Sequence, residues 1–185
     1  MKAKAQITSE RLILRPPVHG DELKIFNRYA GDPEVTRYLS WPRHKSISDS
    51  KAFIRFSIES WSKWQAGPYL VWNRKDKQLL GSTGFAFESA ERISAGYVFA
   101  KDSWGKGYAT ESMLAILEEA IRINVPCLYA FCHPYHKPSR RVLDKCGFIR
   151  YSDGDYETEF PNLNHGTRNN AECYRMVLQK TNITG

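Results

Sequence analysis

Two glycines two residues apart, Gly105 and Gly107, stand in the stretch DSWGKGYATES with Lys106 between them. A strand pattern precedes this stretch and a helical pattern follows it. A glycine turn that leads into a helix exposes unpaired backbone N–H groups and the positive end of the helix dipole, and such a site favours phosphate. Taken alone the motif is weak, because paired glycines also occur where a chain simply turns tightly into a helix.

Two other glycine-rich phosphate motifs are excluded by their spacing. A dinucleotide-binding fingerprint that starts at Gly105 requires a third small residue at position 110, where Thr110 stands. A Walker loop requires Gly-Lys-Ser or Gly-Lys-Thr, whereas Lys106 is followed by Gly107. The loop therefore suits an anion without belonging to either nucleotide-binding class.

Residue periodicity predicts the elements that must position this loop. Alternation places Leu12 and Leu14 on one face of a strand over 11–16. The expected order after it is two helices, three strands of an antiparallel meander, a helix, a strand, a short helix and two last strands. Their ranges are 20–32 and 46–67, then 68–73, 79–87 and 93–100, then 109–125, 127–134, 138–147, 148–156 and 171–179. Residues 157–170 are expected to form a loop.

This order predicts one domain over residues 1–185, of the α+β (mixed α/β) class. The two longest helices are amphipathic and should lie against the sheet. The inward side chains expected on them are Phe53, Ile54, Ile58, Trp61 and Trp64 on the first, and Met113, Leu114, Leu117 and Ile121 on the second.

Composition and charge restrict the class of partner. The chain has 185 residues, 42% of them hydrophobic, and a net charge of +7, which indicates an anionic partner. The basic residues are scattered and no long basic tail is present, so nucleic acid is an unlikely partner. No run of eighteen apolar residues and no apolar signal centre occur, so we expect a cytoplasmic protein that does not enter membranes.

The segment AGYVFAKDSWGKGYATES resembles the signature of the GCN5-related N-acetyltransferase (GNAT) family, in which a strand leads into a loop that holds the pyrophosphate of acetyl-CoA. Four more segments resemble the RimJ/RimL-like branch of that family and follow its order: TSERLILRP, DPEVTRYLSWP, LLGSTGF and SRRVLDKCGF. The resemblance implies the GNAT-like acyl-CoA N-acyltransferase fold, with a central, mostly antiparallel sheet flanked by helices. It also implies an acetyl-CoA-dependent N-acetyltransferase.

The resemblance assigns cofactor contacts to two stretches. Backbone N–H groups of six residues are expected to face the pyrophosphate: Gly105, Lys106, Gly107, Tyr108, Ala109 and Thr110. The pantetheine arm is expected to lie along Val98, Phe99 and Ala100. It should enter between the strands 93–100 and 127–134, which a bulge in the first of them would separate.

Four positions depart from the family pattern. Trp104 stands at the usual Gln or Arg of the loop, Ser94 at a usual glutamate, His136 at a usual asparagine, and Leu143 at a tyrosine that often protonates the leaving thiolate. The catalytic candidates are therefore Ser139 and His136, which should also contact the cofactor. The hydroxyl of Ser139 could assist the thiolate, cap the helix, or do both.

The general base is not assigned by the sequence. Glu88, Glu91 and Asp102 are carboxylates near the expected mouth of the site, although each also fits a solvated turn charge. A zinc site built from Cys127, Cys132 and the histidines near them is disfavoured, because strand residues five apart point to opposite faces. We expect no metal and four reduced cysteines.

The acceptor is expected to be a primary amine that attacks directly in a ternary complex. RimJ/RimL relatives imply a protein N-terminal amine of the ribosomal-protein type. A small-molecule amine, such as an antibiotic or a metabolite, and a non-catalytic module that binds CoA or nucleic acid are the alternatives. The acceptor groove should be built from residues 30–42, the strand that ends near Phe87 and residues 157–170. The sequence does not predict the oligomeric state.

Overall fold

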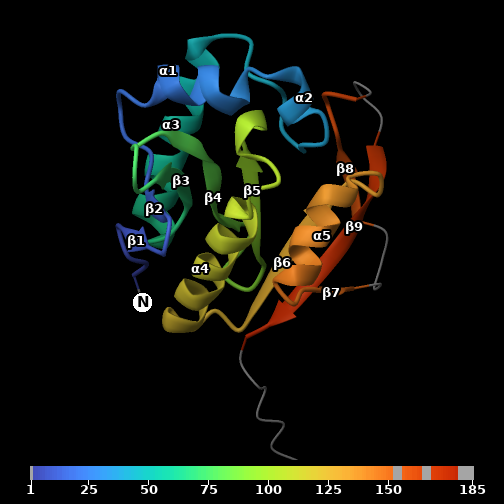
Figure 1. Ribbon diagram of the computed structural model, residues 1–185. Helices are drawn as coiled ribbons and strands as arrows, with labels where there is room; N and C mark the ends of the chain where they lie inside the picture. Colours follow the sequence, from blue (N-terminus) through green and yellow to red (C-terminus); the bar gives the residue numbers. More distant parts are fainter. Residues whose placement is uncertain (1, 152–155, 164–167, 179–185) are drawn as a thin grey trace, which may run out of the picture.

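A computed structural model describes residues 2–151, 156–163 and 168–178 of the protein. Its strands form one sheet in the order β1-β2-β3-β4-β5-β6-β9-β7, and β8 pairs with β9 (Figure 1). Neighbouring strands are antiparallel except for the parallel pair β5–β6, which confirms the predicted mostly antiparallel sheet. The strands are β1 Ile7–Thr8, β2 Leu12–Arg15, β3 Pro68–Asn73, β4 Leu79–Phe87, β5 Ile93–Phe99, β6 Cys127–Cys132, β7 Ile149–Arg150, β8 Tyr156–Glu159 and β9 Arg168–Val177.

Helices cover both faces of this sheet, as two separate apolar cores show. One core joins Leu12 and Leu14 to Met113, and Figure 1 shows α4 and α5 together in front of the sheet. The other core joins Ile25 and Ile54 to the opposite side of β3. The helices are α1 Glu22–Ile25, its π-helical continuation η1 Phe26–Ala30, α2 Pro33–Thr36, α3 Ile47–Trp64, the 3-10 turn η2 Lys101–Ser103, α4 Tyr108–Arg122 and α5 Lys137–Lys145.

Two expected inward side chains of α4 face solvent instead. Met113 is fully buried and Leu117 is buried, whereas Leu114 is 44% exposed and Ile121 is 52% exposed. Successive helical residues are rotated by about 100°, and the buried face of α4 is centred on Met113, Ile116 and Ala120, which are all fully buried, so it is turned away from Leu114 and Ile121. Ile58 of α3 is also exposed, at 41%.

The C-terminal third also differs from the prediction. Residues 157–170 were expected to be loop, but β8 reaches Glu159 and β9 begins at Arg168. The two strands pair with each other in an antiparallel ladder, which the residue pattern of neither segment predicts. The strand expected over 148–156 is represented by the two residues of β7 and the start of β8, and residues 152–155 of it lie outside the described residues.

The sheet opens between its two parallel strands. β5 and β6 pair only at Ser94 and Tyr129, near the start of each strand. Toward their carboxyl ends β5 and β6 no longer pair with each other. β5 nevertheless stays paired with β4 to its last residue, and β6 stays paired with β9 along its whole length. The expected bulge in 93–100 is not seen in the β4–β5 register, which runs without a shift. The separation therefore begins between β5 and β6.

Across the described part of the chain, every helix is too short or too polar to cross a bilayer.

Candidate active site

The glycine loop has the backbone conformation that an anion site requires. Gly105 has φ +73° and Gly107 has φ +80°, values that only glycine adopts without strain. A Cβ at Gly105 would meet no atom within 4 Å, so this glycine is needed for its conformation and not for space. Gly107 is the N-cap of α4, whose first N–H groups have no partner within the helix. The predicted loop 105–110 is thus built to present backbone donors.

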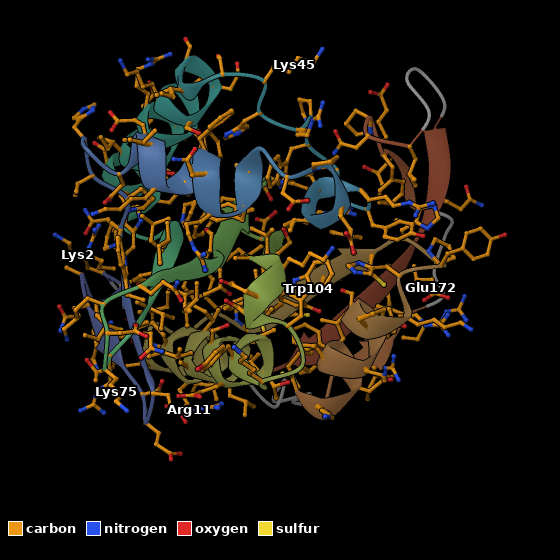
Figure 2. All side chains as sticks on the ribbon, turned by 45° about the horizontal axis from the view of Figure 1, so that its top comes forward. Lys2, Arg11, Lys45, Lys75, Trp104 and Glu172 are labelled. Carbon is orange, nitrogen blue, oxygen red and sulfur yellow. The ribbon has the colours of Figure 1, made fainter. Side chains whose placement is uncertain are left out.

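Trp104 joins this loop to the end of β5, beside which Figure 2 shows it. Its indole Nε1 donates to the carbonyl oxygen of Phe99 at 2.7 Å. The N–H of Ala100 donates to Leu80 in β4 at 2.8 Å. Because successive strand residues direct their backbone groups to alternate sides, Phe99 directs its own N–H away from β4, toward the opening. Among Val98, Phe99 and Ala100, only Phe99 directs a backbone donor there.

A cleft of about 920 Å³ lies at the opening between β5 and β6. Three of the predicted site residues, Val98, His136 and Ser139, line it. The wall facing them comes from the segment after α2 and from α3, and β8 with the residue that follows it adds a third side. These include parts of all three regions predicted to form the acceptor groove. The described lining residues there include Tyr38, Leu39, Ser40, Trp41, Pro42, Phe85, Ala86, Thr158 and Phe160.

Ser139 is not the N-cap of α5. The cap is His136, and Ser139 is the third residue of the helix. Its buried hydroxyl oxygen lies 2.8 Å from the phenol oxygen of Tyr97 in β5, and that phenol also lies 2.9 Å from the Ser139 carbonyl. The interpretation of Ser139 as an ordinary helix cap is therefore wrong.

Tyr97 is a site residue that sequence reasoning missed. It lines the same cleft as Ser139, and burial raises the pKa of its phenol, which stays protonated at neutral pH. The only signal in the sequence was its place in the strand that enters the glycine loop. Its partner lies 42 residues away and could not be identified from spacing.

His136 holds a neutral ring in the cleft wall. The imidazole stacks on Tyr38, with ring centroids 5.0 Å apart. Burial, together with a smaller effect of the neighbouring His133, lowers the pKa of His136 to about 4. At neutral pH the ring therefore carries no proton that it could donate as an imidazolium ion.

Of the three predicted carboxylates, only Glu88 lines the cleft. It forms an ion pair with Arg92 at 2.9 Å. Asp102 instead faces Arg28, which approaches its two oxygens at 2.8 and 3.0 Å, and Glu91 lies exposed in the turn between β4 and β5. Ser94, at the usual glutamate position, does line the cleft.

The cysteine and histidine residues do not assemble into a metal centre within the described residues, which contain no group of three or more potential ligands. Along β6 the burial alternates, so Cys132 is buried and Cys127 is half-buried. Burial raises the pKa of Cys132, which lines the cleft, to about 12.

A sheet that opens at the parallel pair β5–β6, beside a glycine loop at a helix start, fits the acyl-CoA N-acyltransferase fold that the sequence resemblance implies. Residues 11–149 match the family described as "Acetyltransferase (GNAT) domain", and the chain belongs to this family of N-acetyltransferases. It is 30% identical to the uncharacterized N-acetyltransferase YnaD of Bacillus subtilis (strain 168) over 146 residues, which are 78% of this chain and 82% of YnaD.

Two solved structures show the same fold. RimL, a ribosomal L7/L12 alpha-N-protein acetyltransferase in complex with CoA, superposes with a TM-score of 0.79 at 16% identity, over 94% of this chain and 98% of RimL. Spermidine N-acetyltransferase from Vibrio cholerae, in complex with CoA and spermine, gives 0.75 at 16% identity, over 92% of this chain and 97% of the enzyme. At 16% identity these likenesses support the fold alone. The two proteins also act on different amines.

Proposed function

We propose that this GNAT enzyme transfers the acetyl group of acetyl-CoA to the free α-amine at a protein N-terminus, of the ribosomal-protein type found in the RimJ/RimL-like branch. One observation carries the proposal. The opening between β5 and β6 lies between a loop suited to pyrophosphate and a cleft of about 920 Å³, and Ser139 lines that cleft. Both substrates can therefore reach one point from opposite sides.

The residues on the cofactor side fit CoA. The N–H groups of 105–110 would hold the pyrophosphate, and the opening beside Val98 and Ala100 would take the pantetheine arm. The N–H of Phe99 would donate a hydrogen bond to the cofactor in that opening. When bound, acetyl-CoA supplies an activated thioester. A fixed backbone donor at the carbonyl oxygen of that thioester stabilises the charge that develops during transfer.

Tyr97 and Ser139 would handle the proton for the departing thiolate. The phenol has one proton and two possible acceptors on Ser139, the carbonyl at 2.9 Å and the hydroxyl oxygen at 2.8 Å. When the phenol donates to the hydroxyl oxygen, the proton of Ser139 is free to point into the cleft. A serine hydroxyl is a weak acid, so Ser139 acts by hydrogen bonding or as a relay, and Tyr97 sets its direction.

The charges of the cleft favour an α-amine over a polyamine. Two of the described lining residues are carboxylates, Asp49 and Glu88, and both already have partners. Asp49 accepts from the N–H groups of Lys45 and Ser46 at 2.8 and 3.0 Å, and Glu88 pairs with Arg92. Arg43 and Lys45 also line the cleft. These two cations balance the two carboxylates, whereas a polyamine carries several positive charges and would need a surplus of carboxylates at this wall.

The thiol in the cleft favours direct attack by the amine. Cys132 is the nucleophile that could form a covalent acyl-enzyme, but its raised pKa of about 12 keeps it protonated at neutral pH. A protonated, buried thiol is a poor nucleophile. After incubation with acetyl-CoA and no acceptor, intact-mass measurement should therefore show no acetylated protein.

Release of free thiol from acetyl-CoA tests the proposal across a panel of acceptors. Peptides with a free N-terminus should be the best substrates, and the same peptides with a blocked N-terminus should be inactive. Spermidine and small aromatic amines are the comparison compounds. A preference for one of these amines would overturn the acceptor assignment, and binding of acetyl-CoA without turnover on any amine would indicate a non-catalytic module.

A further inference from the structure

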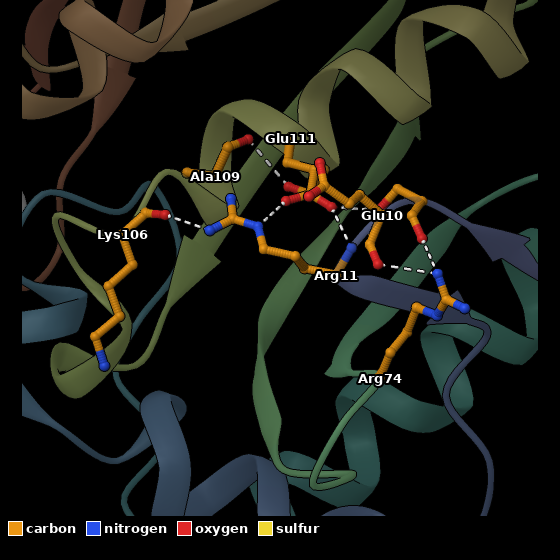
Figure 3. Close-up of polar contacts among 8 residues, drawn as sticks. Glu10, Arg11, Arg74, Lys106, Ala109 and Glu111 are labelled. Carbon is orange, nitrogen blue, oxygen red and sulfur yellow. Dashed lines mark hydrogen bonds and ion pairs between the residues drawn. The ribbon is translucent and has the colours of Figure 1, made fainter.

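Arg11, in the N-terminal hairpin, contacts the glycine loop and the first turn of α4 at the same time (Figure 3). Its Nε pairs with Glu111 at 2.7 Å, and its Nη1 donates to the carbonyl oxygen of Lys106 at 2.9 Å. The guanidinium also lies over the ring of Tyr108, 4.7 Å from its centroid. One side chain thus bridges both ends of the turn into α4.

The carboxylate of Glu111 fixes this arginine to the helix. It accepts from the backbone N–H of Arg11 at 2.8 Å and from the hydroxyl of Ser9 at 2.7 Å. Burial favours the neutral acid, but the hydrogen bonds from Ser9 and Arg11 outweigh it and lower the pKa of Glu111. Arg74 supports the same hairpin turn by donating to the carbonyls of Ser9 and Glu10, both at 2.9 Å. Arg11 therefore rests on a rigid base.

The hydrogen bond to Lys106 sets the orientation of one peptide group of the loop. In a trans peptide the C=O and the N–H point in opposite directions. Because Arg11 holds the carbonyl of Lys106, the N–H of Gly107 is directed to the other side, away from the guanidinium. Glycines at 105 and 107 leave the loop free to adopt other conformations, and this contact restricts them.

We propose that Arg11 is a positioning residue for acetyl-CoA, holding the peptide between Lys106 and Gly107 so that the loop N–H groups are preset for pyrophosphate. The proposal rests on the proposed function of the loop. Glu111 neutralises the guanidinium, so Arg11 acts through geometry more than through net charge. Trp104 stands where a cation is usual in the loop, and Arg11 stabilises the loop from a separate element.

Calorimetric titration with acetyl-CoA tests this role in two Arg11 variants. Arg11→Gln should raise the Kd roughly tenfold, the scale of a lost charged hydrogen bond. Arg11→Lys should restore little, because one ammonium cannot serve both the carboxylate and the carbonyl with fork geometry. The dependence of Kd on salt should stay that of the wild type. For CoA lacking the 3′-phosphate, Arg11→Gln should raise the Kd by the same factor as for acetyl-CoA, because the contact concerns the pyrophosphate loop.

Two further variants separate this effect from general stability. Glu111→Gln removes the base of the arrangement and should raise the Kd as Arg11→Gln does. Arg122→Gln is the matched control, because Arg122 ties the carbonyl of Lys2 and the carboxylate of Glu119 at the far end of α4, at 2.7 and 2.6 Å. It should leave the Kd unchanged even if it lowers the melting temperature.

Three results would overturn the inference. They are an unchanged Kd in folded Arg11→Gln, an equal loss in Arg122→Gln, and full rescue by Arg11→Lys with a weaker salt dependence in Arg11→Gln, which would make Arg11 a direct phosphate contact. If the wild-type protein itself does not bind acetyl-CoA, the proposed function fails, and this outcome is distinct from the other three.

Discussion

Ser139→Ala is the substitution that most sharply separates catalysis from binding in this protein. The change removes the hydroxyl that lies 2.8 Å from Tyr97, while the phenol keeps the Ser139 carbonyl at 2.9 Å as a partner. The free energy of unfolding should therefore fall by only about 0.5–1.5 kcal/mol. Turnover should fall roughly ten- to a thousandfold, which is about 1.4–4 kcal/mol of transition-state stabilisation.

Steady-state rates measure turnover, calorimetry measures the affinity for acetyl-CoA, which should change little, and a melting curve measures stability, all on one preparation. Tyr97→Phe should lose roughly three- to thirtyfold in turnover, less than Ser139→Ala, because the serine keeps its proton but loses its fixed direction. Ser57→Ala is a matched control: Ser57 is a fully buried serine of α3 whose hydroxyl donates to Phe53 at 2.8 Å. Turnover within twofold of wild type in Ser139→Ala would refute the role of this hydroxyl.

Three more variants probe the rest of the site. Gly107→Val places a β-branched side chain at φ +80° and should raise the Kd for acetyl-CoA more than tenfold in calorimetry. Gly20→Ala, at φ +101° in an exposed turn, should leave the Kd unchanged. His136→Gln should remove part of the loss of stability in acid. The folded-state pKa of His136, about 4, lies below the unfolded value, so stability present above about pH 6.5 is lost as the pH falls toward 4. Urea titrations at several pH values should show this loss as at most about 1.4 kcal/mol of unfolding free energy per pH unit. Trp104→Phe removes the hydrogen bond to Phe99 and should weaken acetyl-CoA binding a few-fold by the same calorimetry.

Local patterns predicted the parts of the fold that depend on local physics. Leu12 and Leu14 alternate along β2 and are both fully buried, as a strand on one sheet face requires. Gly105 and Gly107 were predicted to form a turn into a helix, and their positive φ values are the reason that glycine occupies both positions. In each case the signal lies within a few residues of the feature that it predicts.

Contacts between distant segments could not be predicted in this way. Arg11 reaches Glu111 across 100 residues, and Tyr97 reaches Ser139 across 42. Neither pair has a spacing that a periodicity or a motif would detect. The inward face predicted for α4 was centred on the wrong side of the helix for a related reason, because which side is buried depends on how the sheet and α5 pack around the helix. Ile116 is fully buried there, whereas Leu114 and Ile121 are exposed.

A crystal structure of the protein with CoA would test the central claim most directly. The account predicts the pyrophosphate at the N–H groups of 105–110, the pantetheine between β5 and β6, and the sulfur within hydrogen-bonding distance of the Ser139 hydroxyl. CoA bound elsewhere, or a sulfur that faces away from Ser139 and Tyr97 in the opening, would contradict it.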